Sequence, residues 1–377
     1  MKIDSFYNGV TFFRRKKALI AQFLCPHLVI STSSAAGGIQ RGMEYAVNNQ
    51  SCEATNHSRN INYRDIQGYH RFVCKPLGLP PEKTVMMGTA ANMHHAAIVH
   101  KNFEELEVVA VVTGGVEANA GRAGDPASVL ETAEGFIRLD ADGRRQQGTI
   151  NIMLFISRPL TEAALTRAIV TATEAKTAAL QELAINSRYS SGLATGTGTD
   201  QIIIAAAEPQ QDLYRLSWAG KHGKLGELIG RVVIAAVKKT LARQNGITPG
   251  GQCAAKIHLE RFGCDTASMT EGICGYLPEK TAQLLRQNFQ AINHDPLVVA
   301  AVAALVHLQD KIRWGILPRS CLAEILGAGA AQLACSVGGR YDKMALYRQQ
   351  LGEESADDFF ALCWRAFALG FADKWPE

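Results

Sequence analysis

The chain has 377 residues, of which 47% are hydrophobic and 20% are charged, as in an ordinary globular protein. Its net charge is only +4 and its aromatic content is 7%, so composition indicates neither a basic nucleic-acid surface nor a platform for stacked bases. A chain of this length is too long to fold around one small hydrophobic core, so we expect one large domain with an appendage.

The cysteines and the apolar segments predict a cytoplasmic protein. Nine cysteines are spread singly, without a Cys-x-x-Cys pair, and no secretory segment opens the chain. We therefore expect reduced thiols that act as small buried hydrophobes. The longest apolar stretches, such as residues 296–308, fall short of the ~20 helical residues that cross a bilayer, which predicts no membrane span.

Strands dominate the first half of the predicted structure. β-Branched and apolar runs predict strands at residues 10–13, 18–24, 27–31, 84–89 and 107–113. Residues 135–139 and 148–157 flank Asp140-Ala141-Asp142-Gly143, which predicts an antiparallel hairpin with an Asp-Gly turn. Such a hairpin excludes a purely parallel sheet.

Two long helices are predicted next. Residues 161–183 begin at Thr161, a suitable cap, and carry an apolar stripe that only Lys176 interrupts. A second amphipathic helix is predicted at residues 223–242. A cluster of breakers at residues 245–251 indicates a boundary, beyond which helices are predicted at 278–292, 296–308, 320–337 and 356–372.

These elements predict an α+β fold: a mixed, largely antiparallel sheet packed with helices, followed by an all-helical C-terminal module. The domain bounds that we expect are residues 1–245 and 252–377. The role of the helical module is not indicated by its sequence.

The loop at residues 187–200 is the richest candidate site. Its fourteen residues include six serines and threonines and three glycines, which let a backbone approach a ligand closely. No Walker lysine or Gly-x-Ser-x-Gly elbow is present. Asp200 is a candidate general base, with hydrogen bonding to the loop's own amides as the alternative. The candidate ligand-binding hydroxyls are Ser190, Ser191, Thr195, Thr197 and Thr199.

A second polar loop follows the strand at residues 107–113. It presents Glu117, Asn119, Arg122 and Asp125, a dense set of polar groups at the end of a rigid strand. The alternative is that Arg122 and Asp125 merely pair with each other.

Lys176 and His222 complete the candidate set. A lysine on an apolar stripe must extend to solvent, pair with a carboxylate or titrate at a lowered pKa. His222 lies at a helix N-terminus, where the dipole favours a neutral imidazole that can accept a proton. Glu227 and Arg231 are expected to form an ordinary surface pair.

No metal site is predicted. His94, His95 and His100 do not have the spacing of a helical ligand pair, and there is no His-Glu-x-x-His. We interpret these histidines as ordinary ones.

Several ordered motifs resemble the adenosylcobinamide amidohydrolase family over about residues 18–241. They are Thr149-Ile-Asn-Ile through Arg158-Pro-Leu-Thr, Ala172-Thr-Glu-Ala-Lys-Thr-Ala-Ala-Leu-Gln-Glu-Leu, the 187–200 run and Lys224-Leu-Gly-Glu-Leu-Ile-Gly. The resemblance implies hydrolysis of the amide that joins the aminopropanol arm to the corrin, giving adenosylcobyric acid and aminopropanol. It implies a corrinoid substrate that carries its own cobalt, and no cofactor of the protein itself.

Amide hydrolysis needs an activated nucleophile, donors for the oxyanion and an acid for the leaving amine. We expect Asp200 or Glu117 to activate water and His222 or Lys176 to protonate the amine, with a serine or threonine nucleophile as the alternative to water. Alanine at His222 or Asp200 should then lower turnover and preserve folding. A non-catalytic corrinoid- or nucleotide-binding module and a phosphate-transferring enzyme are the rival functions.

Overall fold

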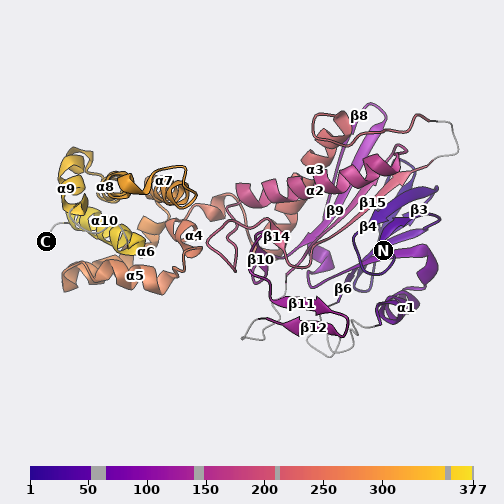
Figure 1. Cartoon of the computed structure of the whole chain (residues 1–377), viewed down its shortest axis with the longest axis horizontal. Coiled ribbons are helices and arrows are strands. Elements are labelled where there is room, and N and C mark those ends of the chain that lie inside the picture. The colour runs from indigo at the N-terminus through magenta and orange to yellow at the C-terminus, as the bar shows by residue number, and fades with distance from the viewer. Residues whose placement is uncertain (52–64, 140–147, 209–212, 353–357, 376–377) are drawn as a thin grey trace. The chain divides into compact units, whose positions relative to one another are not determined.

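A computed structural model describes residues 1–51, 65–139, 148–208, 213–352 and 358–375 (Figure 1). The chain divides into two compact units, Met1–Thr248 and Pro249–Glu377. The division falls within the run Asn-Gly-Ile-Thr-Pro-Gly-Gly, whose glycines and proline interrupt regular structure.

The first unit is built on a six-stranded sheet and a five-stranded sheet. In the six-stranded sheet only β13 and β15 are parallel neighbours, and its order is β5 (Gly38–Gln40), β4 (His27–Ser31), β15 (Gln201–Ala207), β13 (Ile150–Ile156), β9 (Leu106–Gly114) and β8 (Ala97–Phe103). In the five-stranded sheet only β6 and β7 are parallel, and its order is β1 (Lys2–Phe6), β2 (Val10–Arg15), β3 (Ala18–Phe23), β6 (Tyr45–Gln50) and β7 (Thr84–Thr89).

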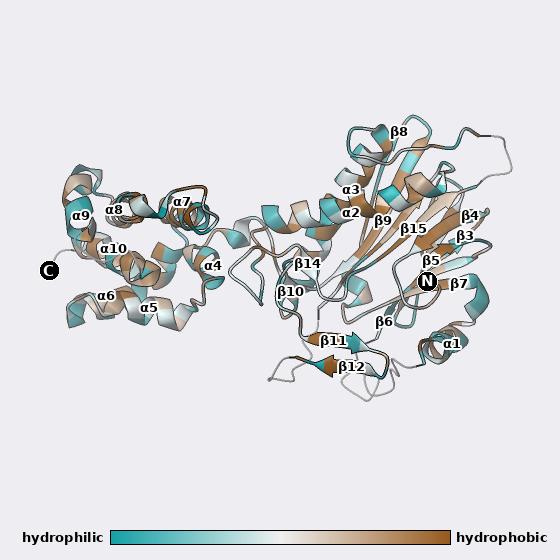
Figure 2. Cartoon of the chain, in the orientation of Figure 1, coloured by the Kyte–Doolittle hydropathy of each residue, from teal (hydrophilic) through white to brown (hydrophobic). Residues whose placement is uncertain are grey.

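Side-chain alternation along the strands produces four layers. On β13, Ile152 and Leu154 join the core beneath α2 (Glu162–Glu182) and α3 (Lys224–Asn245), whereas Met153 and Phe155 join the core between the two sheets. Because β13 is covered on both faces, its whole sequence is apolar apart from Asn151, and Figure 2 shows the same apolar character in β9 and β15. The outer face of the five-stranded sheet packs on α1 (Ile66–Leu77). The predicted mixed, largely antiparallel sheet with helices is confirmed.

The predicted hairpin has different partners in the structure. β12 (Gly135–Arg138) pairs with β11 (Val129–Thr132), and β13 pairs with β9 and β15. The predicted Asp-Gly turn lies outside the described residues. The pairing of residues 135–139 with 148–157 was wrong because β13 is a central strand buried on both faces, whereas the Phe136 side chain is 62% exposed. The sheet is nevertheless mixed, as predicted.

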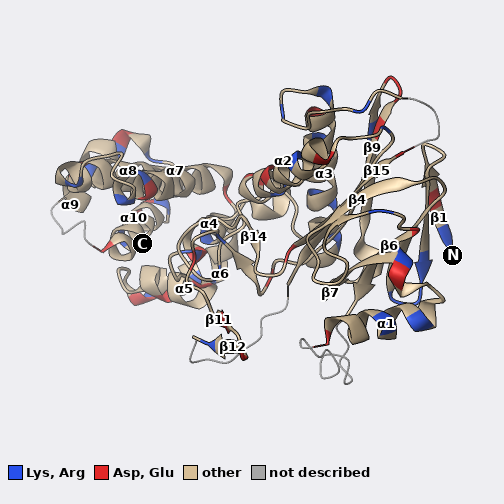
Figure 3. Ribbon diagram, turned by 45° about the vertical axis from the view of Figure 1, so that its right-hand side comes forward, with Lys and Arg blue, Asp and Glu red and all other residues tan. Residues whose placement is uncertain are grey.

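The two long helices begin and end close to their predicted bounds. The Ala164 N–H donates to the Thr161 side-chain oxygen (3.2 Å), which caps α2, and α3 begins after Gly223. Lys221, which precedes α3, pairs with Glu174 of α2 at 3.0 Å, and Arg231 pairs with Glu227 within α3 at 2.8 Å. Figure 3 shows charged residues on the surfaces of both helices. The predicted surface pair of Glu227 and Arg231 is confirmed.

The second unit is helical in its described residues, and the predicted C-terminal helical module is confirmed. Its helices share one apolar core, and α8 and α10 approach so closely that a Cβ on Gly338 would lie 2.8 Å from the Gly370 oxygen. Three short helices, α4, α5 and α9, were not predicted. The bounds are α4 (Ala255–Glu260), α5 (Thr266–Cys274), α6 (Glu279–Asn293), α7 (Pro296–Arg313), α8 (Leu322–Gly338), α9 (Met344–Gly352) and α10 (Phe359–Lys374).

One helical segment meets the length and composition of a membrane span, contrary to the expectation from the sequence. Residues 319–338 form a 20-residue apolar segment, and half of its most apolar window is buried within the unit. The bent pair α6 and α7 passes the same test only if the two helices, 82° apart, are taken as one span. A buried core helix has the same composition, so these segments do not establish a membrane span.

The described cysteines are free thiols, and five of the eight are buried. Burial raises the pKa of both Cys74 and Cys264 to about 11, which keeps them protonated at neutral pH. They therefore act as small apolar side chains, as predicted.

His27 makes the first unit sensitive to acid. Its ring stacks on Phe23 with centroids 4.4 Å apart, and burial lowers its pKa to about 4 despite the hydrogen bond to the Cys25 carbonyl. Above pH 6.5 the histidine is neutral in both the folded and unfolded states, whereas below it the unfolded chain binds the proton first. We expect His27 to remove about 3 kcal/mol of unfolding free energy between pH 6.5 and 4. Urea unfolding should show that His27→Gln loses less stability than the wild type over this range; an equal loss would contradict the prediction.

Candidate active site

The two polar loops predicted separately come together at one end of the six-stranded sheet. They pair through β10 (Ala120–Gly121) and β14 (Gly196–Thr197), which are neighbours in Figure 1. The Thr195 N–H donates to the Gly121 carbonyl (2.8 Å), and the Ala123 N–H donates to the Thr195 hydroxyl (2.9 Å). The loops are therefore one interlocked structure.

Asn119 ties this structure to the start of β13. Its Nδ2 donates to the Gly148 carbonyl (2.9 Å), and its Oδ1 accepts from the Tyr189 hydroxyl (2.7 Å). The Thr199 hydroxyl donates to the same Gly148 carbonyl (3.0 Å). Asn119 is buried, and both ends of its amide are used, so the structure gives it a supporting position within the loops.

Asp125 holds the outer turn of the loops. It accepts from the Arg122 backbone N–H and from the Ser187 hydroxyl, both at 2.6 Å. Although desolvation acts in the opposite direction, the Ser187 and Ser190 hydroxyls lower the pKa of Asp125. The Arg122 side chain passes across Gly192, where a Cβ would lie 2.5 Å from Arg122 Cδ. Asp125 is thus anchored by hydroxyls and a backbone N–H.

Lys176 and Asp200 form a buried ion pair between α2 and the end of the loop. Their side chains are 8% and 10% exposed. Asp200 Oδ1 also accepts from the Ile150 N–H (2.8 Å) and the Thr197 hydroxyl (2.5 Å), and Oδ2 accepts from the Thr197 N–H (3.0 Å). Of the alternatives left open, Lys176 pairs with a carboxylate and Asp200 bonds the loop's own amide.

These contacts bear on the chemistry open to Asp200. A carboxylate offers about four lone-pair positions. Four donors, including the Lys176 ammonium, occupy those of Asp200. The arrangement suits a group that fixes the loop better than one that takes a proton from water.

The close packing of this pair explains why residue 196 is glycine. A Cβ at Gly196 would overlap Asp200 Oδ2 and lie 2.6 Å from Lys176 Nζ, whereas a Cβ at Gly198 would lie 3.8 Å from its nearest neighbour, Asn119. We expect Gly196→Ala to lower the free energy of unfolding by about 2–3 kcal/mol. Gly198→Ala, the matched control, should be nearly neutral by urea denaturation; equal effects in the two variants would contradict this account.

Glu117 and His222 lie at opposite ends of α3. Glu117 is exposed, with its Oε2 3.4 Å from Nδ2 of Asn245, the last residue of the helix. His222 is also exposed and precedes the first turn. A helix of 22 residues is about 33 Å long. The structure therefore does not bring His222 to Glu117, and the two cannot act on the same amide in this conformation.

A layer of polar side chains that was not predicted from the sequence lies between the two sheets. In the six-stranded sheet, the inward-facing residues are apolar along most of each strand. At the strand ends next to the two loops, the polar layer takes their place. A polar residue at an inward-facing position of an apolar strand, as in Ile150-Asn151-Ile152, is the signal that would have found it. Its members are Asn48, Thr113, Asn151 and Gln201.

The three histidines that were interpreted as ordinary ones each lie next to a polar side chain. Arg14 lies 3.3 Å from His94, Gln244 lies 3.0 Å from His95, and Glu107 lies 3.1 Å from His100. Within the described ranges, no three histidine, cysteine or acidic side chains are grouped to hold a metal ion.

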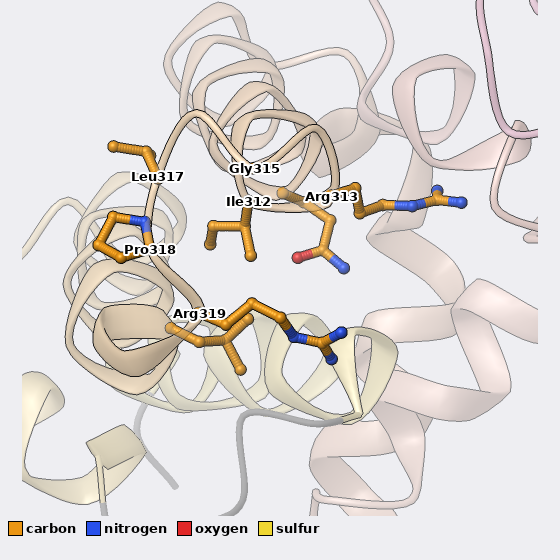
Figure 4. Close-up of a pocket in the computed structure, with 8 residues that line it drawn as sticks. Ile312, Arg313, Gly315, Leu317, Pro318 and Arg319 are labelled. Carbon is orange, nitrogen blue, oxygen red and sulfur yellow. The ribbon is translucent and has the colours of Figure 1, made fainter.

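A cavity of about 600 Å³ lies in the second unit, between the end of α7 and the start of α8 (Figure 4). Arg313, Leu317 and Arg319 are among its lining residues. None of the predicted site residues lines it, because all of them belong to the first unit.

Comparison with known proteins identifies the first unit. The model of the adenosylcobinamide amidohydrolase family matches residues 3–249. The chain belongs to this family. The family match ends at the boundary between the two units, so the helical unit lies outside it.

Relatives of the family include two archaeal proteins. The chain is 35% identical to an uncharacterised protein of Methanocaldococcus jannaschii over 237 residues, which are 61% of this chain and 88% of the relative. It is 36% identical to an adenosylcobinamide amidohydrolase of Methanosarcina mazei over 104 residues, which are 26% of this chain and 48% of the relative.

A solved structure of a Pyrococcus horikoshii protein aligns with 62% of this chain and 83% of its own, at 10% identity and a TM-score of 0.31. A score this low supports no inference about the fold or the site.

Proposed function

We propose that the first unit hydrolyses the amide between the aminopropanol arm and the corrin of adenosylcobinamide. The products are adenosylcobyric acid and aminopropanol, and the reaction serves corrinoid salvage in the cytoplasm. Family membership supports the reaction, and the meeting of the two polar loops carries the placement of the site. The substrate brings its own cobalt, and the protein supplies no cofactor.

In this proposal Glu117 activates the attacking water. Among the carboxylates predicted for the site, Asp200 is occupied by four donors and Asp125 by hydroxyls and an N–H, whereas Glu117 is exposed and lies at the long distance of 3.4 Å from Asn245 Nδ2. Glu117 takes a proton from water as the oxygen attacks the carbonyl carbon, and returns it to the nitrogen as the C–N bond breaks. The amine thus leaves neutral without an acid from His222 or Lys176.

The hydroxyls of the 187–200 loop contribute differently to the proposed site. The Thr197 and Thr199 hydroxyls already donate within the protein, to Asp200 (2.5 Å) and to Gly148 (3.0 Å). The Thr195 hydroxyl accepts the Ala123 N–H, which leaves its own hydrogen for a substrate oxygen. We assign Ser191 and Thr195 to the corrinoid carboxamides, and Ser190, whose hydroxyl bonds Asp125, to loop geometry together with Thr197 and Thr199. Arg122, which lies across Gly192, is assigned to the substrate side of the loop.

Mass spectrometry of the purified full chain with adenosylcobinamide tests this function. Equal amounts of free aminopropanol and adenosylcobyric acid are expected, and their absence would refute the proposal. Corrinoid binding without product would instead select the non-catalytic binding module. An acid quench during turnover adds a test of the route, because a serine or threonine nucleophile leaves a covalent ester that can be trapped, whereas direct attack by water leaves no adduct.

A further inference from the structure

The polar layer between the sheets contains a buried hydrogen-bond acceptor without a partner. Asn151 is fully buried, and its Oδ1 has no hydrogen-bond partner in the part of the chain that the structure describes. An unmade hydrogen bond in a buried position is costly. The acceptor therefore needs a donor from a ligand or from a water molecule.

The orientation of the Asn151 amide is fixed by its neighbours. Nδ2 donates to Asn48 Oδ1 (3.0 Å) and to the Gly88 carbonyl (2.9 Å). Both partners are acceptors, so a flipped amide would place three oxygens against one another. Oδ1 is consequently the free end of the side chain.

Thr113 supplies a donor beside this acceptor. It is the direct partner of Asn151 across the antiparallel β9–β13 ladder, where facing Cβ atoms lie about 4.5–5.5 Å apart. Its Oγ1 accepts from Asn48 Nδ2 (2.8 Å), which leaves the hydroxyl hydrogen for another group. Neighbouring strands thus offer one acceptor and one donor on the same face.

This pair matches a primary carboxamide. A –CONH₂ group presents an N–H and a C=O side by side, whereas the trans secondary amide of the aminopropanol arm presents them on opposite sides. The pair therefore suits one of the carboxamide arms around the corrin better than it suits the scissile bond.

The layer lies one residue from the end of the strands. Asn151 is the second residue of β13 and Thr113 is the last but one of β9, and a strand rises about 3.3 Å per residue. The preceding residue, Ile150, donates its N–H to Asp200, so this end of the sheet is the one that carries the two loops.

We propose that Asn151, assisted by Thr113, binds a primary carboxamide arm of the corrinoid. This assignment rests on the proposed function and makes Asn151 a specificity-determining residue. A carboxylate in place of that carboxamide lacks the N–H and brings negative charge to the Asn151 oxygen.

Four measurements combine to test the inference: wild type and Asn151→Leu, each with adenosylcobinamide and with its separated monocarboxylate derivatives. For one derivative we expect the wild type to lose about 10²-fold or more in kcat/KM. Asn151→Leu should raise KM for the amide substrate about 10- to 100-fold, change kcat less, and lose most of the discrimination against that derivative.

Matched variants separate binding from stability. Met153→Ala removes a buried side chain from the same face of the same strand, so it should lower the thermal midpoint without changing KM or discrimination. Thr113→Val is measured in the same way and provides the test if Asn151→Leu does not fold. Unchanged KM and discrimination in the folded variants would overturn the inference and assign the acceptor to a buried water. An inactive wild type would refute the proposed function instead.

Discussion

Replacing Glu117 with glutamine is expected to lower kcat for adenosylcobinamide hydrolysis by about 10²- to 10⁴-fold, with KM changed only a few-fold. Glutamine keeps the size of the side chain and an oxygen that can face Asn245, which lies 3.4 Å from Glu117 Oε2. It cannot take the proton of the attacking water. Steady-state release of aminopropanol, normalised to folded protein, measures the effect.

Glu174→Gln is the matched control. Glu174 is another exposed glutamate of the same unit, and it pairs with Lys221 at 3.0 Å on the surface of α2 and outside the two loops. Its variant should keep wild-type turnover. If Glu117→Gln also keeps it, the proton acceptor is a different group, and the alternative of a serine or threonine nucleophile gains support from any adduct trapped by acid quench.

The elements that the sequence predicted well are those whose signals are local. Thr161 and the apolar stripe define α2 within the helix itself, and a hydroxyl- and glycine-rich run such as residues 187–200 cannot form a core. Lys176 stood out because it interrupts that stripe. In the structure Lys176 forms an ion pair with Asp200, which is one of the three possibilities considered for this lysine.

The elements that the sequence predicted poorly depend on distant partners. Two strands close in sequence suggested a hairpin, but the apolar β13 was required at the centre of the sheet. His222 lies just before the N-terminus of α3, as the sequence predicts. The sequence does not show, however, that Glu117 and its loop lie at the other end of this helix. In the sequence Asn151 is only a single polar residue in an apolar run. Its polar environment depends on β6 and β7, which supply the acceptors Asn48 Oδ1 and the Gly88 carbonyl.

Alanine at Asp200 is expected to destabilise the first unit by about 3–5 kcal/mol, in contrast to the preserved folding that the sequence alone led us to expect. The change would leave the Lys176 ammonium buried without its partner, since the Lys176 side chain is only 8% exposed. It would also remove the acceptor for the Ile150 and Thr197 N–H groups. Urea denaturation monitored by circular dichroism, with the family unit's transition resolved from that of the helical unit, measures the loss.

A double-mutant cycle distinguishes the missing charge from the missing hydrogen bonds. Lys176→Met alone removes the ammonium but leaves Asp200 with its three remaining donors, so it should cost less than Asp200→Ala. The double variant Lys176→Met with Asp200→Ala should recover part of the loss of Asp200→Ala, because no charge is then buried without a partner. If Asp200→Ala instead unfolds like the wild type and only turnover falls, Asp200 is not a structural anchor, and its role as the general base must be restored.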